Sequence, residues 1–111
     1  MKLNKLTERN YKSIVDRGLI SPTTNYKAFL DKFDEELKEL KEAVDYIRTC
    51  KKNLYSNFEH VKEELADVIL VGLNLAHHYG INIEEELIKK IEINEQRAEN
   101  NTDSGDAKND N

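Results

Sequence analysis

Residues 61–79 read VKEELADVILVGLNLAHHY, the most apolar stretch of the chain. At about 100° per residue, one helical face collects six of its side chains: Val61, Leu65, Val68, Gly72, Leu75 and Tyr79. Residues 69–71 and Leu73 extend this apolar surface nearly all round the helix. A helix that is apolar on most sides lies at the centre of a bundle or at a subunit interface. The stretch therefore predicts a central helix over about residues 58–79, ended by Gly80.

Three further helices are predicted around this one. Residues 26–50 carry a single apolar stripe of the kind that faces a core: Leu30, Phe33, Leu37, Leu40, Val44 and Ile47. Residues 2–16 show a weaker helical periodicity. Residues 83–99 follow Asn82, a residue type that caps helix N-termini. The pattern favours an all-α fold.

The segments between and after these helices are polar. Residues 17–24, with Gly18, predict an ordered loop, and residues 51–57 predict a turn. Residues 100–111 contain one alanine as their only apolar side chain, and a segment of that composition is disordered. We therefore expect one four-helix bundle domain over residues 1–99, followed by a disordered tail.

Composition narrows the function further. A chain of 111 residues is too short for two independent cores. Its net charge of −5 disfavours a nucleic-acid surface, and it contains no apolar run long enough to span a membrane. The first residues, MKLNKLTERN, lack the apolar stretch of a secretory signal, and the single Cys50 excludes an internal disulfide framework. We expect a soluble, cytoplasmic protein that binds neither nucleic acid nor membrane.

Two pairs of acidic residues carry the chemistry. Glu36 with Glu39, and Glu64 with Asp67, are each three residues apart, so each pair shares a helix face. Both pairs lie at the same offset from the apolar stripe of their helix, so antiparallel packing would bring them face to face. Either pair alone is typical of a solvated face. Glu64, however, lies inside the most apolar segment, where an unpaired carboxylate costs several kcal/mol. Four such carboxylates predict a site for Mg²⁺, with Mn²⁺ as a possible substitute.

The acidic residues stand in a recognisable order. Glu35-Glu36-Leu37-Lys38-Glu39 is followed, after 24 residues, by Glu64-Leu65-Ala66-Asp67. At these residues the sequence resembles the MazG-like, all-α nucleoside triphosphate pyrophosphohydrolases. The turn Gly80-Ile81-Asn82 and the helical segment 90–97 also match that family's pattern, so the resemblance covers about residues 26–99. It implies metal ligands at four positions: Glu36, Glu39, Glu64 and Asp67.

The resemblance also implies a reaction. It is the Mg²⁺-dependent hydrolysis of a nucleoside triphosphate between its α- and β-phosphates, which gives the monophosphate and pyrophosphate. Glu35 matches the additional acid of the first motif. Glu35 or Glu39, as a carboxylate not fully engaged by metal, would take the proton of the attacking water. Clearing unwanted nucleotides is the biological role that the family suggests.

Further polar residues fit such a substrate. Lys90, Asn94 and Arg97 share one face of the last helix, where Lys and Arg can hold phosphate oxygens. A solvated or Glu-paired basic face is the alternative interpretation. Asn74 and His78 lie near the face of Asp67 on the central helix, either as substrate contacts or within a buried polar cluster. The loop at residues 17–24 either closes over the site or only connects two helices.

Three questions stay open from the sequence: the oligomeric state, the substrate, and whether the protein is an enzyme. The excess of apolar surface, together with the family resemblance, predicts a homodimer or homotetramer with sites near the subunit interface. Phosphoribosyl-ATP pyrophosphohydrolases share the fold and the acidic pattern, so phosphoribosyl-ATP is an alternative substrate. A non-catalytic helical interaction module, in which the acids only confer solubility, is an alternative of a different class.

Overall fold

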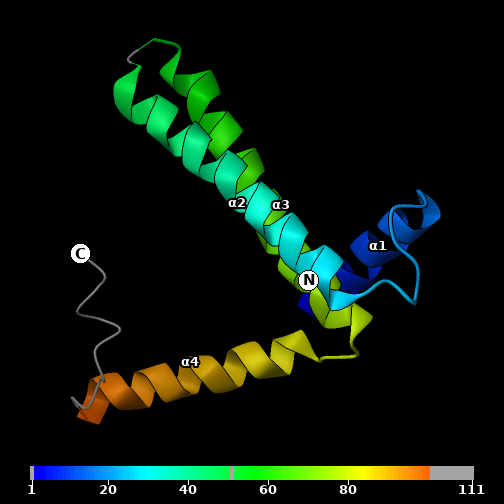
Figure 1. Ribbon diagram of the computed structural model, residues 1–111. Helices are drawn as coiled ribbons and strands as arrows, with labels where there is room; N and C mark the ends of the chain where they lie inside the picture. Colours follow the sequence, from blue (N-terminus) through cyan, green and yellow to red (C-terminus); the bar gives the residue numbers. More distant parts are fainter. Residues whose placement is uncertain (1, 51, 101–111) are drawn as a thin grey trace.

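Four helices account for most of the chain (Figure 1). The computed structural model describes residues 2–50 and 52–100, and these contain no strand. The helices are α1 (Leu3–Asp16), α2 (Tyr26–Thr49), α3 (Leu54–His78) and α4 (Ile83–Asn100). The prediction of an all-α chain with four helices is confirmed. The tail expected from residue 100 onward lies outside the described residues, except for Asn100, which ends α4.

One predicted boundary is wrong: α3 begins at Leu54, four residues before the expected start. Asn53 takes the left-handed backbone conformation, with φ at 54°, that Asn tolerates better than most residues. The Asn57 amide and the Ser56 hydroxyl then both donate hydrogen bonds to the Asn53 carbonyl, at 3.0 and 3.2 Å. The polar side chains that suggested a turn therefore begin the helix. All other helix boundaries agree with the predictions to within one residue.

The α2 and α3 helices form an antiparallel pair that runs the length of both (Figure 1). Gly72 of α3 lies against the ring of Phe33 of α2, and a Cβ atom at Gly72 would be 3.3 Å from the ring's Cζ. Small buried side chains, among them Ala43 and Ala76, keep the two helices close elsewhere. This close approach allows short polar side chains on the two helices to reach each other.

Helix α1 lies across α3 and also contacts the start of α4. Asn4 of α1 donates a side-chain hydrogen bond to Asn82 at 2.8 Å, and its backbone amide donates to the Glu84 carboxylate. The buried Thr7 closes its hydroxyl onto the Leu3 carbonyl within α1. The two hydrogen bonds of Asn4 hold the start of α4 against α1 and so help to set the direction in which α4 leaves the α2–α3 pair.

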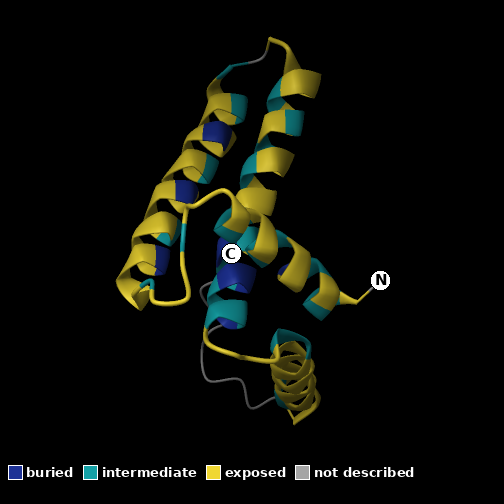
Figure 2. Ribbon diagram, turned by 90° about the vertical axis from the view of Figure 1, so that its right-hand side faces the viewer, coloured by how far each residue is buried: buried dark blue, intermediate teal, exposed yellow. Residues whose placement is uncertain are grey.

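The fourth helix extends away from that pair (Figure 1). Within the described residues α4 contacts only α1 and α3, and none of its own residues is buried. Figure 2 shows it as almost wholly exposed. Its apolar residues Leu87, Ile88 and Ile91 are all exposed. None of the described helices combines the length and apolarity that crossing a bilayer requires.

Candidate functional site

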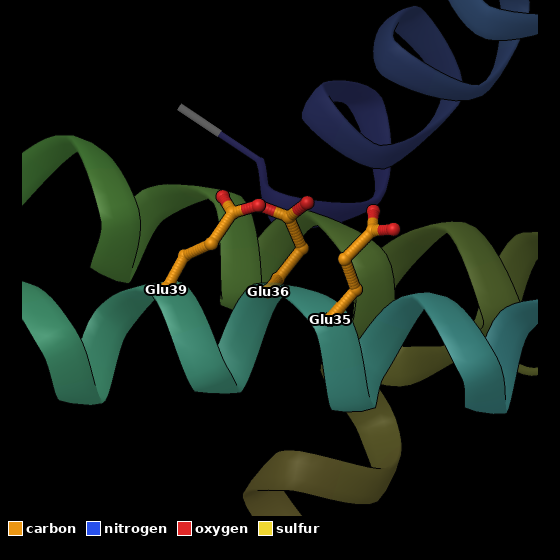
Figure 3. Close-up of side chains that lie close together, drawn as sticks. All are labelled: Glu35, Glu36 and Glu39. Carbon is orange, nitrogen blue, oxygen red and sulfur yellow. The ribbon is translucent and has the colours of Figure 1, made fainter.

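Carboxylates from α2 and α3 meet midway along the helical pair. One carboxylate oxygen from each of Glu36, Glu64 and Asp67 lies within 4.8 Å of the other two. Oxygens of Glu35, Glu36 and Glu39 meet the same condition. Figure 3 shows these last three projecting from the same side of α2, with the carboxyl groups of Glu36 and Glu39 next to each other. The structure thus brings together all four predicted metal ligands and the fifth acid beside them.

Two of these carboxylates are largely removed from solvent. The Glu36 side chain is 8% exposed and the Glu64 side chain 12%. Within the described part of the chain, the buried Oε1 atom of Glu64 has no hydrogen-bond partner. A buried acceptor without a partner costs free energy, and a bound cation would remove that cost.

Two carboxylates of the cluster, Glu39 and Asp67, have raised pKa values, in part because the neighbouring carboxylates are negatively charged. A hydrogen bond with the Glu64 carboxyl raises the pKa of Glu39 above its ordinary value of 4.5, and the charge of Glu36 adds to the effect. Burial raises the pKa of Asp67 above its ordinary value of 3.8, followed by the charges of Glu36 and Glu64. Carboxylates that repel one another in this way are stabilised by a divalent cation.

The donor set fits a hard divalent ion. Glu36, Glu39, Glu64 and Asp67 offer only carboxylate oxygens, which suit Mg²⁺ or Mn²⁺ better than zinc or copper. The partnerless oxygen of Glu64 is the feature of this arrangement that an ordinary solvated acidic face would not have.

A cavity of about 350 Å³ opens beside the acidic cluster, between α1, the following loop, α2 and α3. Its polar lining combines acids, cations and amides: Asn10, Arg17, Lys32, Glu36, Asp67 and Asn74. A second cavity, of about 310 Å³, adjoins it and shares Lys32 and Asn74. The second cavity is otherwise apolar: Ile14, Leu19, Ile20, Ala28, Phe29 and Val71.

Another cavity, of about 530 Å³, lies on the opposite side of the cluster, toward the far end of the α2–α3 pair. Glu39, Glu42 and Glu64 line it together with His60. The two sides of the cluster therefore differ in charge: the cavity toward α1 has two cationic side chains, Arg17 and Lys32, beside the carboxylates of Glu36 and Asp67, whereas the opposite cavity has three carboxylates and, among the described residues, neither a lysine nor an arginine.

Asn74, which the sequence predicts as a substrate contact, lies beside the acidic cluster. It is buried, its Oδ1 accepts a hydrogen bond from Asn10 Nδ2 at 2.8 Å, and it lines the same cavity as Glu36 and Asp67. Sequence reasoning missed Asn10, because its contact with Asn74 spans 64 residues and no local pattern announces it.

His78 occupies a different position. Its Nδ1 atom is 2.7 Å from the Tyr11 hydroxyl, and its Nε2 atom is 2.7 Å from the Thr24 carbonyl oxygen. Its ring also packs against Phe29, with the ring centroids 4.7 Å apart. Both ring nitrogens are thus engaged within the chain, and the residue joins α1 and the 17–24 loop to the end of α3.

The remaining predicted residues, Lys90, Asn94 and Arg97, lie on α4. They line none of the cavities beside the acidic cluster, because α4 leads away from the α2–α3 pair (Figure 1). Within one chain, therefore, the structure does not bring them to the carboxylates.

Comparison with known proteins gives one match. The model of the MazG-like family matches residues 29–109, a range that includes all five acids of the cluster. No curated protein and no solved structure matches the chain.

Proposed function

We propose that this chain, which belongs to the MazG-like family, is a Mg²⁺-dependent nucleoside triphosphate pyrophosphohydrolase. It would hydrolyse the bond between the α- and β-phosphates and release a nucleoside monophosphate and pyrophosphate. The observation that carries the proposal is the partnerless, buried oxygen of Glu64 within a cluster of carboxylates, beside a cavity lined by cations and amides.

The acids would divide two tasks between them. Glu36, Glu39, Glu64 and Asp67 would hold Mg²⁺, with Mn²⁺ as a substitute. Bound there, the ion would neutralise phosphate charge and make water a better nucleophile. Glu35 or Glu39 would accept the proton of the attacking water.

The charge difference between the two sides of the cluster supports one orientation of the substrate. Phosphates would lie toward Lys32 and Arg17, because the three carboxylates of the opposite cavity repel them. The sugar and base would then occupy the adjoining apolar cavity, next to Phe29 and Asn74. Along α3, Asn74 lies seven residues from Asp67, about 10 Å, which suits the length of a nucleoside.

Assembly would complete the site. The exposed apolar residues Leu87, Ile88 and Ile91 of α4 favour burial against a second copy in a homodimer or homotetramer. In such an assembly, Lys90 and Arg97 of one subunit would approach the phosphates bound at the carboxylates of another and stabilise the departing pyrophosphate.

The test is a panel of ribo- and deoxyribonucleoside triphosphates, with phosphoribosyl-ATP added, in Mg²⁺ or Mn²⁺. Pyrophosphate and orthophosphate are measured separately, and we expect pyrophosphate alone. Glu64→Gln should abolish the activity. Glu63→Gln is the matched control, because Glu63 is the adjacent residue with a side chain that is 77% exposed. Turnover by Glu64→Gln equal to that of the unaltered protein would refute the proposal.

A further inference from the structure

Lys32 holds a position that the acidic motif does not account for. It lies on α2, one turn before Glu36, and its Nζ atom is 3.0 Å from Glu36 Oε2 and 2.7 Å from Glu35 Oε1. Within the described residues, the other side-chain nitrogen that forms a close contact with the cluster is Nδ1 of the His60 ring, which is 3.8 Å from Glu64 Oε2. Lys32 is therefore the ammonium group that neutralises the most buried acid of the site.

The charge of Lys32 acts on the whole cluster. Hydrogen bonds to Glu35 and then Glu36 raise the pKa of the Lys32 ammonium above its ordinary value of 10.5. Its charge also lowers the pKa of Asp67 on the facing helix, against the stronger effect of burial. Without a divalent ion, this one positive charge opposes the mutual repulsion of the carboxylates.

Lys32 also faces the space proposed for the substrate. It lines both the cavity shared with Arg17 and the adjoining apolar cavity. Its side chain is 54% exposed, so the ammonium can move without disturbing the core. A lysine ammonium on a four-carbon stem binds phosphate as a mobile point charge.

We propose that Lys32 is a phosphate-binding residue which, in the metal-free protein, forms an ion pair with Glu36 instead. When a divalent cation takes the Glu36 carboxylate, two like charges compete for it, and the ammonium moves into the adjoining cavity. There it contacts a phosphate oxygen of the nucleotide. This inference rests on the proposed function of the same site.

Two binding measurements by isothermal titration calorimetry at pH 8 test it. The first titrates Mn²⁺ alone, and the second titrates inorganic tripolyphosphate in saturating Mg²⁺, so that neither needs turnover or a known base. Lys32→Met should bind Mn²⁺ about three- to tenfold more tightly, because the competing charge is gone. It should bind tripolyphosphate about tenfold more weakly, because a charged hydrogen bond to phosphate is lost.

Two variants serve as controls. Lys32→Arg keeps the charge and should restore both affinities to near those of the unaltered protein. Lys27→Met removes an exposed lysine of the same helix, paired with Asp31, and should change neither affinity.

The outcomes separate the inference from its premise. If the unaltered protein binds Mn²⁺ and tripolyphosphate but Lys32→Met binds Mn²⁺ no more tightly, or tripolyphosphate no more weakly, the role of Lys32 is wrong while the proposed function stands. If the unaltered protein binds neither probe, the proposed function falls, and this inference falls with it.

Discussion

Replacing Glu64 with glutamine should make the metal-free protein more stable while destroying its response to Mg²⁺. Glu64 has a buried oxygen without a partner, and an oxygen of Glu36 and one of Asp67 lie within 4.8 Å of one of its own. At an effective dielectric constant of 20, two full charges at that separation repel by about 3.5 kcal/mol.

Glutamine keeps the shape of the side chain, removes the charge and offers N–H donors to the neighbouring carboxylates. The expected gain is about 1–3 kcal/mol, the cost of a buried unsatisfied group. In a domain of this size, each kcal/mol raises the melting temperature by about 4–8 °C.

The assay is thermal unfolding by circular dichroism, at one protein concentration, in EDTA and then in excess Mg²⁺. The unaltered protein should gain stability from the ion, by about 2.7 kcal/mol at one hundred times the dissociation constant. Glu64→Gln should melt higher in EDTA and shift little with Mg²⁺, and Glu63→Gln should behave like the unaltered protein. A Glu64→Gln protein that melts at or below the unaltered protein in EDTA would show that the carboxylate carries no such strain.

Three more predictions concern the pH dependence of stability, the role of His78, and the exposed apolar face of α4. The pKa values of Glu39 and Asp67 are raised in the folded state, so the folded protein binds more protons than the unfolded chain above their ordinary values of 4.5 and 3.8. In EDTA, the free energy of unfolding should therefore fall as the pH rises from these ordinary values through the raised pKa values of the folded state. Saturating Mg²⁺ should reverse this trend, and urea unfolding at a series of pH values measures both. His78→Phe keeps the ring but loses two hydrogen bonds, so it should cost about 1–3 kcal/mol in urea unfolding and leave Mn²⁺ affinity unchanged; a weakened Mn²⁺ affinity would contradict its purely structural placement. Ile91→Glu should reduce the mass found by light scattering, and a monomeric mass for the unaltered protein would refute the proposed assembly.

Helical periodicity predicts all four helices of this fold, and every helix end except the start of α3 to within one residue. The predicted stripe of α2 is only partly correct: Leu30, Leu37 and Val44 are 39–45% exposed, whereas Phe29, Glu36 and Ala43 are the buried residues of that helix. Spacing indicates that a helix has an apolar face, but the neighbouring helix decides which residues it covers. The start of α3 escaped prediction because Asn53, Ser56 and Asn57 suit a turn as well as a helix start. The choice between the two depends on the backbone conformation at Asn53, which spacing does not encode.

In the site, too, residues with a local sequence signal could be predicted, and contacts between distant residues could not. The acids were found because pairs three residues apart are local, and antiparallel packing then leaves little choice of where the two pairs meet. Lys32 has an equally local signal, its spacing of three and four residues from Glu35 and Glu36, which a search for acids passed over. The two partners of His78 lie 54 and 67 residues away, so its engagement could come only from the folded chain.

The direction of α4 shows what a single sequence withholds. Its stripe of Leu87, Ile88 and Ile91 predicts burial, yet the described chain buries none of it. Hydrophobic spacing says that a face needs a partner but not whether the partner belongs to the same chain. The basic residues Lys90 and Arg97 share that helix, so where α4 packs decides whether they reach the phosphates. The proposed assembly and the completeness of the proposed site are therefore tested together, because a variant that prevents α4 from packing against a second copy should impair both.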